Sequence, residues 1–188
     1  MELIENYVEI DDKKYYFLPL HLAIRFAAEI NFSFYIEINK SKRVMLEHDD
    51  DDLINKLKNY LKKGLREILV SEADYMNFLS EVKNNLEHKF FDPASFKDDE
   101  SNILTLNDAY EMVKKSFQDM GVSPQAIDLA IVVNKRSIQV MKSSSNIFRI
   151  FKQFKNKCNG EFLNAIFVSF TTSCMIDRYY WQSEKVKK

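Results

Sequence analysis

Few residues in this chain have the type and spacing that a catalytic or metal site requires. A run of four aspartates, 49–52, could bind Mg²⁺ or Ca²⁺, because both ions prefer oxygen ligands. The run lacks the alternating oxygens, the glycine and the terminal glutamate of an EF-hand loop. It directly precedes a helical pattern, so we interpret it as the negatively charged start of a helix, where acidic side chains favour the helix dipole.

The histidines and cysteines do not form a metal-binding pattern either. No two of the three histidines form an H-x-x-x-H pair, and no cysteine lies near any of them in the sequence: they are His21, His48 and His88. Cys158 and Cys174 lack the C-x-x-C spacing of zinc and redox sites. Two cysteines in 188 residues do not indicate a disulfide framework and favour a reducing compartment. The sequence therefore predicts no metal site and no cofactor.

One basic and aromatic run, FRIFKQFKNK at 148–157, could form an interaction surface. Its phenylalanines recur every three residues beside basic residues: Phe148, Phe151 and Phe154 next to Arg149, Lys152 and Lys155. Such a helix could lie on a membrane or contact a phosphate backbone. A simpler interpretation places the aromatic side chains in the core and the basic ones in water. The candidate interaction residues here are Phe148, Phe151, Arg149 and Lys152.

Three consecutive aromatic residues, Tyr179, Tyr180 and Trp181, follow the apolar stretch 161–176. Tyrosine and tryptophan are favoured at interfaces because each combines an apolar body with a polar group. We expect this cluster to pack against another part of the protein or against a partner.

The bulk properties exclude several classes of function. The sequence has no G-x-S-x-G elbow, P-loop, dinucleotide fingerprint or H-E-x-x-H pair. Lys plus Arg is 27 and Asp plus Glu is 28, a balance that argues against a dedicated nucleic-acid-binding protein. No window holds 18 consecutive apolar residues, so no membrane span is predicted. The acidic N-terminal residues differ from a signal peptide, and we expect a cytoplasmic location.

The first half of the chain is predicted to combine short strands with helices. Two β-rich runs, 7–11 and 14–19, flank a short turn and predict a hairpin. The stretch 32–39 alternates apolar and polar residues and predicts a half-buried strand that pairs with 43–48. The remaining predicted elements are a short helix within 20–30, a helix from 53 to Gly64, a buried strand at 67–71 and a helix to about 90 capped by Ser71.

Everything beyond residue 102 is predicted to be helical. Helices are expected near 105–120 with Thr105 or Asn107 as cap, near 124–142 with Ser123 as cap, near 147–157, and near 161–178. The predicted class is α+β, with a small mixed β-sheet and helices followed by an all-helical segment. The predicted division is an N-terminal domain at 1–92, a linker at 93–102 and a helical segment at 103–188.

The order of these segments resembles the N-terminal region of bacterial HD-type and HD-GYP-type metal-dependent phosphohydrolases. Over residues 15–90 the resemblance rests on Leu18-Pro19-Leu20, Phe34-Tyr35-Ile36, Lys62-Lys63-Gly64, Ile68-Leu69-Val70, and Tyr75 with Asn85-Leu86. The second half resembles the helical approach to the HD core. There Trp181-Gln182-Ser183 fits a Trp-x-Ser turn, and 184–188 fits the start of the next helix.

The resemblance also implies that this chain lacks the catalytic groups. The family's His-Ser position falls near Asn164-Ala165, and a side-chain amide is a poorer ligand than histidine for iron, manganese or zinc. No His-Asp pair follows before residue 188. By this resemblance, the chain holds no catalytic residue and no metal, and it does not hydrolyse phosphodiesters.

Three hypotheses of function follow. The first is a non-catalytic regulatory or protein-interaction region of an HD-type protein in cyclic-dinucleotide-type signalling. Its partner would be its own C-terminal domain, another protein, or a second copy bound through the helices. The second is a sensor of a small molecule or cyclic dinucleotide, although the six arginines that could meet phosphates are scattered. The third is a phosphohydrolase whose metal site lies beyond this chain. An apolar face left uncovered on the last helix would favour the first hypothesis.

Overall fold

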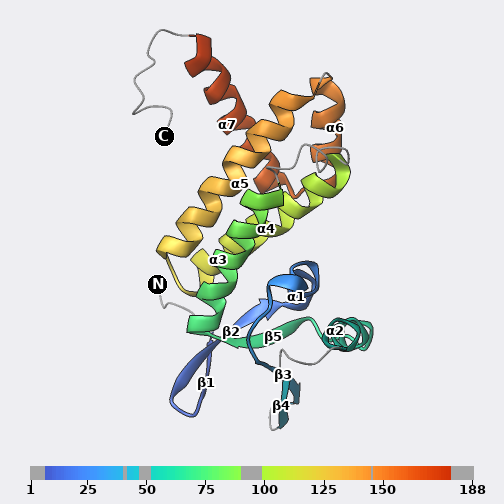
Figure 1. Cartoon of the computed structure of the whole chain (residues 1–188), viewed down its shortest axis with the longest axis vertical. Coiled ribbons are helices and arrows are strands. Elements are labelled where there is room, and N and C mark those ends of the chain that lie inside the picture. The colour runs from blue at the N-terminus through green and yellow to red at the C-terminus, as the bar shows by residue number, and fades with distance from the viewer. Residues whose placement is uncertain (1–6, 40–41, 47–51, 90–98, 145, 179–188) are drawn as a thin grey trace.

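A five-stranded sheet lies at one end of the molecule and helices extend away from it (Figure 1). This computed structural model describes residues 7–39, 42–46, 52–89, 99–144 and 146–178. The predicted α+β class is confirmed, with the strands in the N-terminal half and helices after them.

The sheet is built from two hairpins joined by a central strand. Its strands are β1 (Tyr7–Ile10), β2 (Lys13–Pro19), β3 (Phe34–Asn39), β4 (Lys42–Leu46) and β5 (Glu67–Ser71), in the order β1-β2-β5-β3-β4. Both predicted hairpins are confirmed. The prediction of a mixed sheet is wrong, because β5 also runs antiparallel to both of its neighbours. The apolar run Ile68–Val70 of β5 is buried, as expected for the middle strand.

The turn between β1 and β2 contains two residues in the left-handed region. Asp11 has φ 49° and Asp12 has φ 59°. Two-residue hairpin loops favour turns with positive φ at both positions, because their twist matches that of the strands. Aspartate tolerates this conformation better than most residues that are not glycine.

The helices of the N-terminal half follow the predicted pattern. They are α1 (Leu20–Arg25), the 3-10 turn η1 (Ala27–Glu29), α2 (Leu53–Lys62) and α3 (Glu72–Lys89). Gly64, with φ +95°, follows the end of α2 as predicted. Ser71 caps α3 by accepting a hydrogen bond from the Asp74 backbone N–H at 3.2 Å, and its hydroxyl donates to the Asp74 carboxylate at 2.6 Å. The apolar residues of α3 that recur at helical spacing are fully buried: Tyr75, Phe78, Leu79, Val82 and Leu86.

Four helices make up the rest of the described chain: α4 (Asp99–Asp119), α5 (Pro124–Ser143), α6 (Ile147–Lys157) and α7 (Gly160–Arg178). The predicted cap of α5 is confirmed, since the Ser123 hydroxyl accepts from the Ala126 backbone N–H at 3.2 Å. Asn146 caps α6 in the same way, accepting from the Arg149 backbone N–H at 3.0 Å. Both caps are local interactions, which explains why the sequence pattern located the one at Ser123.

The predicted start of α4 is wrong. The helix begins at Asp99, so the last four residues of the predicted linker 93–102 are helical, and neither Thr105 nor Asn107 is a cap. Ile103 and Leu106 are fully buried and extend the apolar face of the helix toward its N-terminus. The Thr105 hydroxyl instead donates to the Ser101 carbonyl at 2.9 Å, inside the helix. Residues 90–98 lie outside the described part of the chain.

The two halves pack against each other. Helix α3 contacts β2 and β5 as well as α5, and α1 contacts α4. An ion pair joins α1 to α4, with Arg25 Nε 2.7 Å from Asp108 Oδ2, and a second polar contact places His21 Nε2 3.4 Å from Glu111 Oε2. The buried side chains of both halves form one continuous cluster. The division into domains at 1–92 and 103–188 therefore stays a prediction.

None of the helices in the described ranges is long and apolar enough to cross a lipid bilayer.

Candidate functional site

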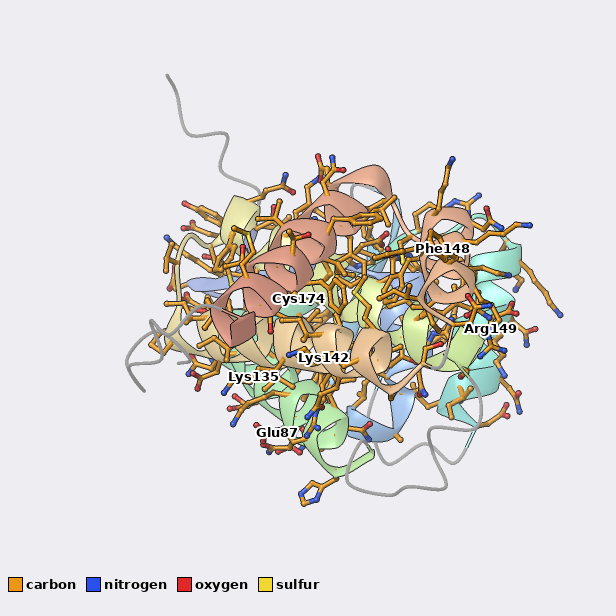
Figure 2. The ribbon with its side chains drawn as sticks, turned by 90° about the horizontal axis from the view of Figure 1, so that it is seen from above. Glu87, Lys135, Lys142, Phe148, Arg149 and Cys174 are labelled. Carbon is orange, nitrogen blue, oxygen red and sulfur yellow. The ribbon has the colours of Figure 1, made fainter. Side chains whose placement is uncertain are left out.

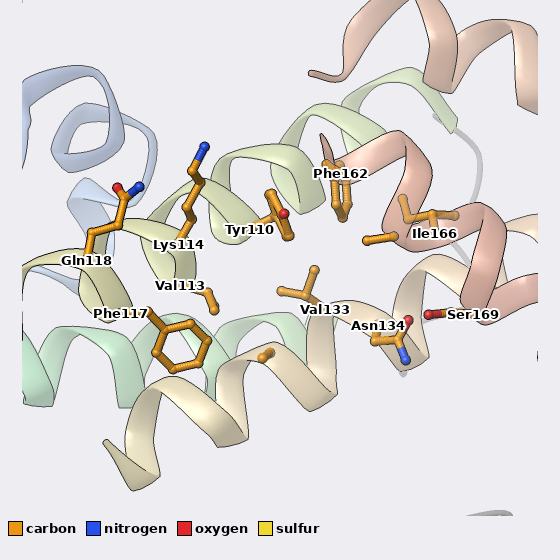
Figure 3. A pocket seen from close by; sticks show the side chains of 12 residues that line it. Tyr110, Val113, Lys114, Phe117, Gln118, Val133, Asn134, Phe162, Ile166 and Ser169 are labelled. Atoms are coloured by element: carbon orange, nitrogen blue, oxygen red, sulfur yellow. The ribbon is translucent and has the colours of Figure 1, made fainter. Parts of the chain in front are cut away.

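An apolar groove lies among α4, α5 and α7 and encloses about 390 Å³. Each helix contributes one face to it: Val113, Val133 and Ile166 point toward the hollow, whereas the ends of Lys114 and Gln118 point away from it (Figure 3). The lining residues are Tyr110, Val113, Lys114, Phe117 and Gln118 of α4, Ala130, Val133 and Asn134 of α5, and Phe162, Ala165, Ile166 and Ser169 of α7. On each helix their spacing of three and four residues places them on one face.

The floor of the groove is part of the core. Val113 and Val133 are buried, and so are Phe162 and Ile166, which α7 contributes. The rings of Tyr110 and Phe162 stack with their centroids 4.7 Å apart and 27° between their planes. This stack holds the first turn of α7 against α4.

The groove carries almost no net charge. Lys114 is the one charged residue among the described residues that line it, and it is paired with Glu161 in the first turn of α7. The Glu161 carboxylate accepts a hydrogen bond from the ammonium and raises the pKa of Lys114. The other polar lining residues, Gln118, Asn134 and Ser169, are uncharged. The groove therefore suits an uncharged, largely apolar occupant.

Exposed apolar side chains lie at the edge of the groove and beyond it, on α4, α5 and the turn between them. Phe117 is 38% exposed and Val122 is 76% exposed. Ile127 and Ile131, at 41% and 43%, lie one helical turn apart on α5 beside the lining residue Ala130. We call these four residues the apolar rim. Together with the groove they form an apolar surface larger than the hollow itself.

The outer face of α7 also carries exposed apolar residues. Val168 is 67% exposed and Met175 is 53% exposed, and these two residues lie about two turns apart on one strip of the helix. Thr171 and Thr172, which are also exposed, lie between them on that strip, so an uncovered apolar face on the last helix stays a prediction. Asn164 and Ala165 are exposed as well, so the position that the HD-type resemblance aligns with a metal-binding histidine lies at the surface of α7.

Comparisons of this chain with protein-family models, with curated proteins and with solved structures give no match. The resemblance to HD-type phosphohydrolases therefore stays a prediction. The structural basis for a function is the groove and the surfaces that adjoin it.

The predicted interaction residues of α6 differ in how exposed their side chains are. Phe148 is 82% exposed, and it comes with Arg149 from the first turn of α6 (Figure 2). Lys152 is also exposed. Phe151 is half-buried and stacks on Phe167 of α7, with ring centroids 4.5 Å apart. Phe151 thus fixes α6 to α7, whereas Phe148 is available for contact with a partner.

Cys158 and Cys174 do not line the groove. Tyr179, Tyr180 and Trp181 fall outside the described residues. Within the described ranges, no three His, Cys, Asp or Glu side chains group in a way that could hold a metal ion. Burial raises the pKa of the Cys158 thiol to about 12, which makes it a poor nucleophile at neutral pH. Neither cysteine is in a disulfide.

Sequence reasoning did not identify the groove. Val113 and Phe117 lie one helical turn apart and belong to one apolar face of α4, yet Val113 is buried and Phe117 is 38% exposed. A weak signal was present in α5, where Ile127 and Ile131 lie outside the face formed by Leu129 and Val133. A helix with apolar residues on more than one face has more apolar surface than a single contact can bury.

Proposed function

We propose that this chain is a non-catalytic regulatory module that binds an apolar helical segment of a protein in the groove among α4, α5 and α7. The observation that carries the proposal is an uncharged apolar groove continuous with the exposed apolar rim. Proteins rarely leave an apolar surface of this kind uncovered unless it binds something. Apolar anchors that fill a pocket are also the groups that dominate binding energy at protein interfaces.

A small apolar molecule is the second candidate occupant. The enclosed volume of about 390 Å³ falls within the range of about 300–1,000 Å³ typical of ligand pockets. The apolar rim favours a protein, because Val122, Ile127 and Ile131 lie beyond the reach of a ligand confined to the hollow. A cyclic dinucleotide is disfavoured there, since the lining has no arginine and its lysine is already paired.

The HD-type resemblance supports a regulatory setting in the cytoplasm. In that setting the partner is a catalytic half, in the same protein or in another. The proposal assigns this chain no hydrolytic chemistry.

Incubation of the purified chain with Mn²⁺ and a chromogenic phosphodiester should give no turnover. Turnover that follows the purified protein through successive columns would overturn the non-catalytic part of the proposal.

Site-specific photocrosslinking tests the groove directly. A photoreactive amino acid at Asn134, which lines the groove, should give a discrete covalent adduct with a protein in cells. The matched control is the same residue at Asn84, which is exposed on α3 away from the groove. Ala130→Trp, which fills the groove, should remove the adduct. Equal adducts from both positions, or an adduct that survives Ala130→Trp, would contradict the proposal.

A further inference from the structure

Positive charge is concentrated in the last three helices, although the whole chain has a formal net charge of −1. Residues 129–176 contain one acidic residue, Glu161, which is paired with Lys114 of α4. The same stretch contains seven basic residues: Lys135, Arg136, Lys142, Arg149, Lys152, Lys155 and Lys157. It covers most of α5 and α7 and all of α6, and α6 and α7 lie at the end of the molecule opposite the sheet (Figure 1). A charge imbalance of this kind within a nearly neutral chain indicates an anionic partner for this end.

One exposed strip of α6 combines this charge with an aromatic ring. Phe148, Lys152 and Lys155 are all exposed, and their spacing of four and three residues places them on one side of the helix. The other side of α6 buries Ile150 and Phe154 in the core. Within the described part of the chain, neither Lys152 nor Lys155 takes part in an ion pair. Both charges are therefore available to a partner.

Helix α7 continues this surface with uncharged residues. The rings of Phe151 on α6 and Phe167 on α7 stack, so the two helices lie side by side at this level. Three exposed residues of α7 share one strip of the helix, at spacings of four and three: Asn164, Val168 and Thr171. The other side of α7 buries Phe162 and Ile166. Both strips therefore face away from the core, and we call the surface formed by these two strips the basic face.

We propose that the basic face binds the surface of an anionic lipid bilayer, with the Phe148 ring inserted at the level of the headgroups. The inference goes beyond the groove and does not depend on it. Peripheral binding combines burial of apolar side chains at the headgroup level with attraction of basic residues to anionic lipids. Lysine side chains keep their ammonium groups at the headgroups while their stems lie along apolar surface. Phe148 supplies the apolar group, and Lys152 and Lys155 supply the charge on the same strip.

A nucleic acid, the other common polyanion, fits the basic face less well. Proteins that bind single strands follow the phosphates with basic residues and stack bases on aromatic rings. The α7 strip offers neither, because Asn164, Val168 and Thr171 carry no charge and no ring. Val168, at 67% exposed, is instead an aliphatic group that gains from leaving water. An uncharged strip beside a basic one suits a bilayer interface, where apolar burial and anionic headgroups occur together.

Sedimentation of the full chain with lipid vesicles tests the binding. We expect the protein to bind vesicles of phosphatidylcholine and phosphatidylserine, and to bind vesicles of phosphatidylcholine alone much more weakly. Lys152→Gln combined with Lys155→Gln should lower the partition coefficient at least about tenfold, because each basic residue near an anionic surface contributes several-fold. The matched control is Lys58→Gln combined with Lys62→Gln. It removes the same charge from exposed positions on α2, beside the sheet, and should leave the partition coefficient nearly unchanged (Figure 1). Far-UV circular dichroism should show that both variants are folded.

Fluorescence tests whether the side chain at position 148 enters the bilayer. Because Trp181 is the only tryptophan in the sequence, Phe148→Trp combined with Trp181→Phe leaves a single indole on the basic face. Anionic vesicles should shift its emission to shorter wavelengths, and brominated lipids should quench it. Ile54→Trp in the same Trp181→Phe background is the control, since Ile54 is exposed on α2 away from the basic face, and it should show neither change.

Equal binding to neutral and anionic vesicles, equal effects of the two lysine pairs, or an unchanged emission from position 148 would each overturn the proposal. Binding of a single-stranded oligonucleotide without binding of vesicles would overturn it as well and would identify a nucleic acid as the partner. Photocrosslinking at Asn134 reports on the groove separately. A chain that captures a protein there but binds no vesicles retains the proposed function and loses only the bilayer surface.

Discussion

Asp108 is the titratable residue whose surroundings most clearly reflect the packing of the two halves. It lies on α4, partly buried under α1, and accepts a hydrogen bond from Arg25 at 2.7 Å. Burial raises the pKa of the Asp108 carboxyl, and the Arg25 guanidinium offsets part of this rise. The ionised pair therefore joins the halves but does not fully compensate for the loss of water around the carboxylate.

The raised pKa predicts how stability depends on pH. The contribution of Asp108 to the free energy of unfolding is fully present below its unfolded pKa of about 3.9. This contribution is lost as the pH rises through the higher pKa of the folded state. The free energy of unfolding of the wild type, relative to Asp108→Asn, should therefore be larger at about pH 3.5 than at pH 7. Urea unfolding at both pH values measures this difference.

A second variant tests the cause assigned to the pKa of Asp108. Arg25→Gln removes the guanidinium that lowers this pKa. In a protein that carries Arg25→Gln, the difference in free energy of unfolding between Asp108 and Asp108→Asn should therefore depend more strongly on pH. If the stability of the wild type relative to Asp108→Asn increased with pH, the raised pKa of Asp108 would be contradicted.

At the scale of elements, one buried amide fixes where α7 begins. Asn107 on α4 is only 7% exposed, and its Oδ1 accepts a hydrogen bond from the Asn159 backbone N–H at 3.1 Å. Asn159 in turn accepts from the Phe162 backbone N–H at 2.8 Å, which caps the first turn of α7. The groove wall therefore depends on a contact between residues 52 positions apart.

Removing this amide should destabilise the protein measurably. We expect Asn107→Ala to lower the free energy of unfolding by about 1–3 kcal/mol, because the Asn159 N–H loses its partner in a part-buried position. Thr105→Ala is the matched control on the same helix, since Thr105 bonds only to Ser101 within α4. Its cost should stay below about 0.5 kcal/mol. Equal effects of the two substitutions in chemical denaturation would show that Asn107 does not hold α7.

At the scale of the whole molecule, α3 connects the sheet to the helices. It packs on β2 and β5 with one part of its surface and on α5 with another. Its core residues belong to the same buried cluster as those of the sheet and of α4 to α7. A continuous core of this kind favours cooperative unfolding of both halves, in contrast to independent domains on either side of a linker.

We therefore predict a single unfolding transition. Hydrogen exchange at increasing denaturant should report the same opening free energy for amides of β5 and of α5. Leu79→Ala, at a fully buried position of α3, should lower both values together by about 2–5 kcal/mol. If Leu79→Ala lowers the opening free energy of the β5 amides but not that of the α5 amides, the result would support the separate domains predicted from the sequence.

Local features of this protein could be read from the sequence because they depend on neighbouring residues. The predicted caps at Ser71 and Ser123 each use a side chain and a backbone N–H three residues ahead. The alternation in 32–39 and the spacing of the α3 core residues follow directly from strand and helix geometry. The α+β class follows from these local patterns alone.

The tertiary structure decided which apolar faces are covered. The helical period of α4 and α7 identifies apolar residues, but it does not say which neighbour meets them. The position of α7 is set by the contact of Asn107 with Asn159 and by the stacking of Tyr110 on Phe162, both between residues about 50 positions apart. That position leaves the groove open on one side of α7 and leaves Val168 at the surface. Burial is a property of the whole packing arrangement, and so the site could be found only in the folded chain.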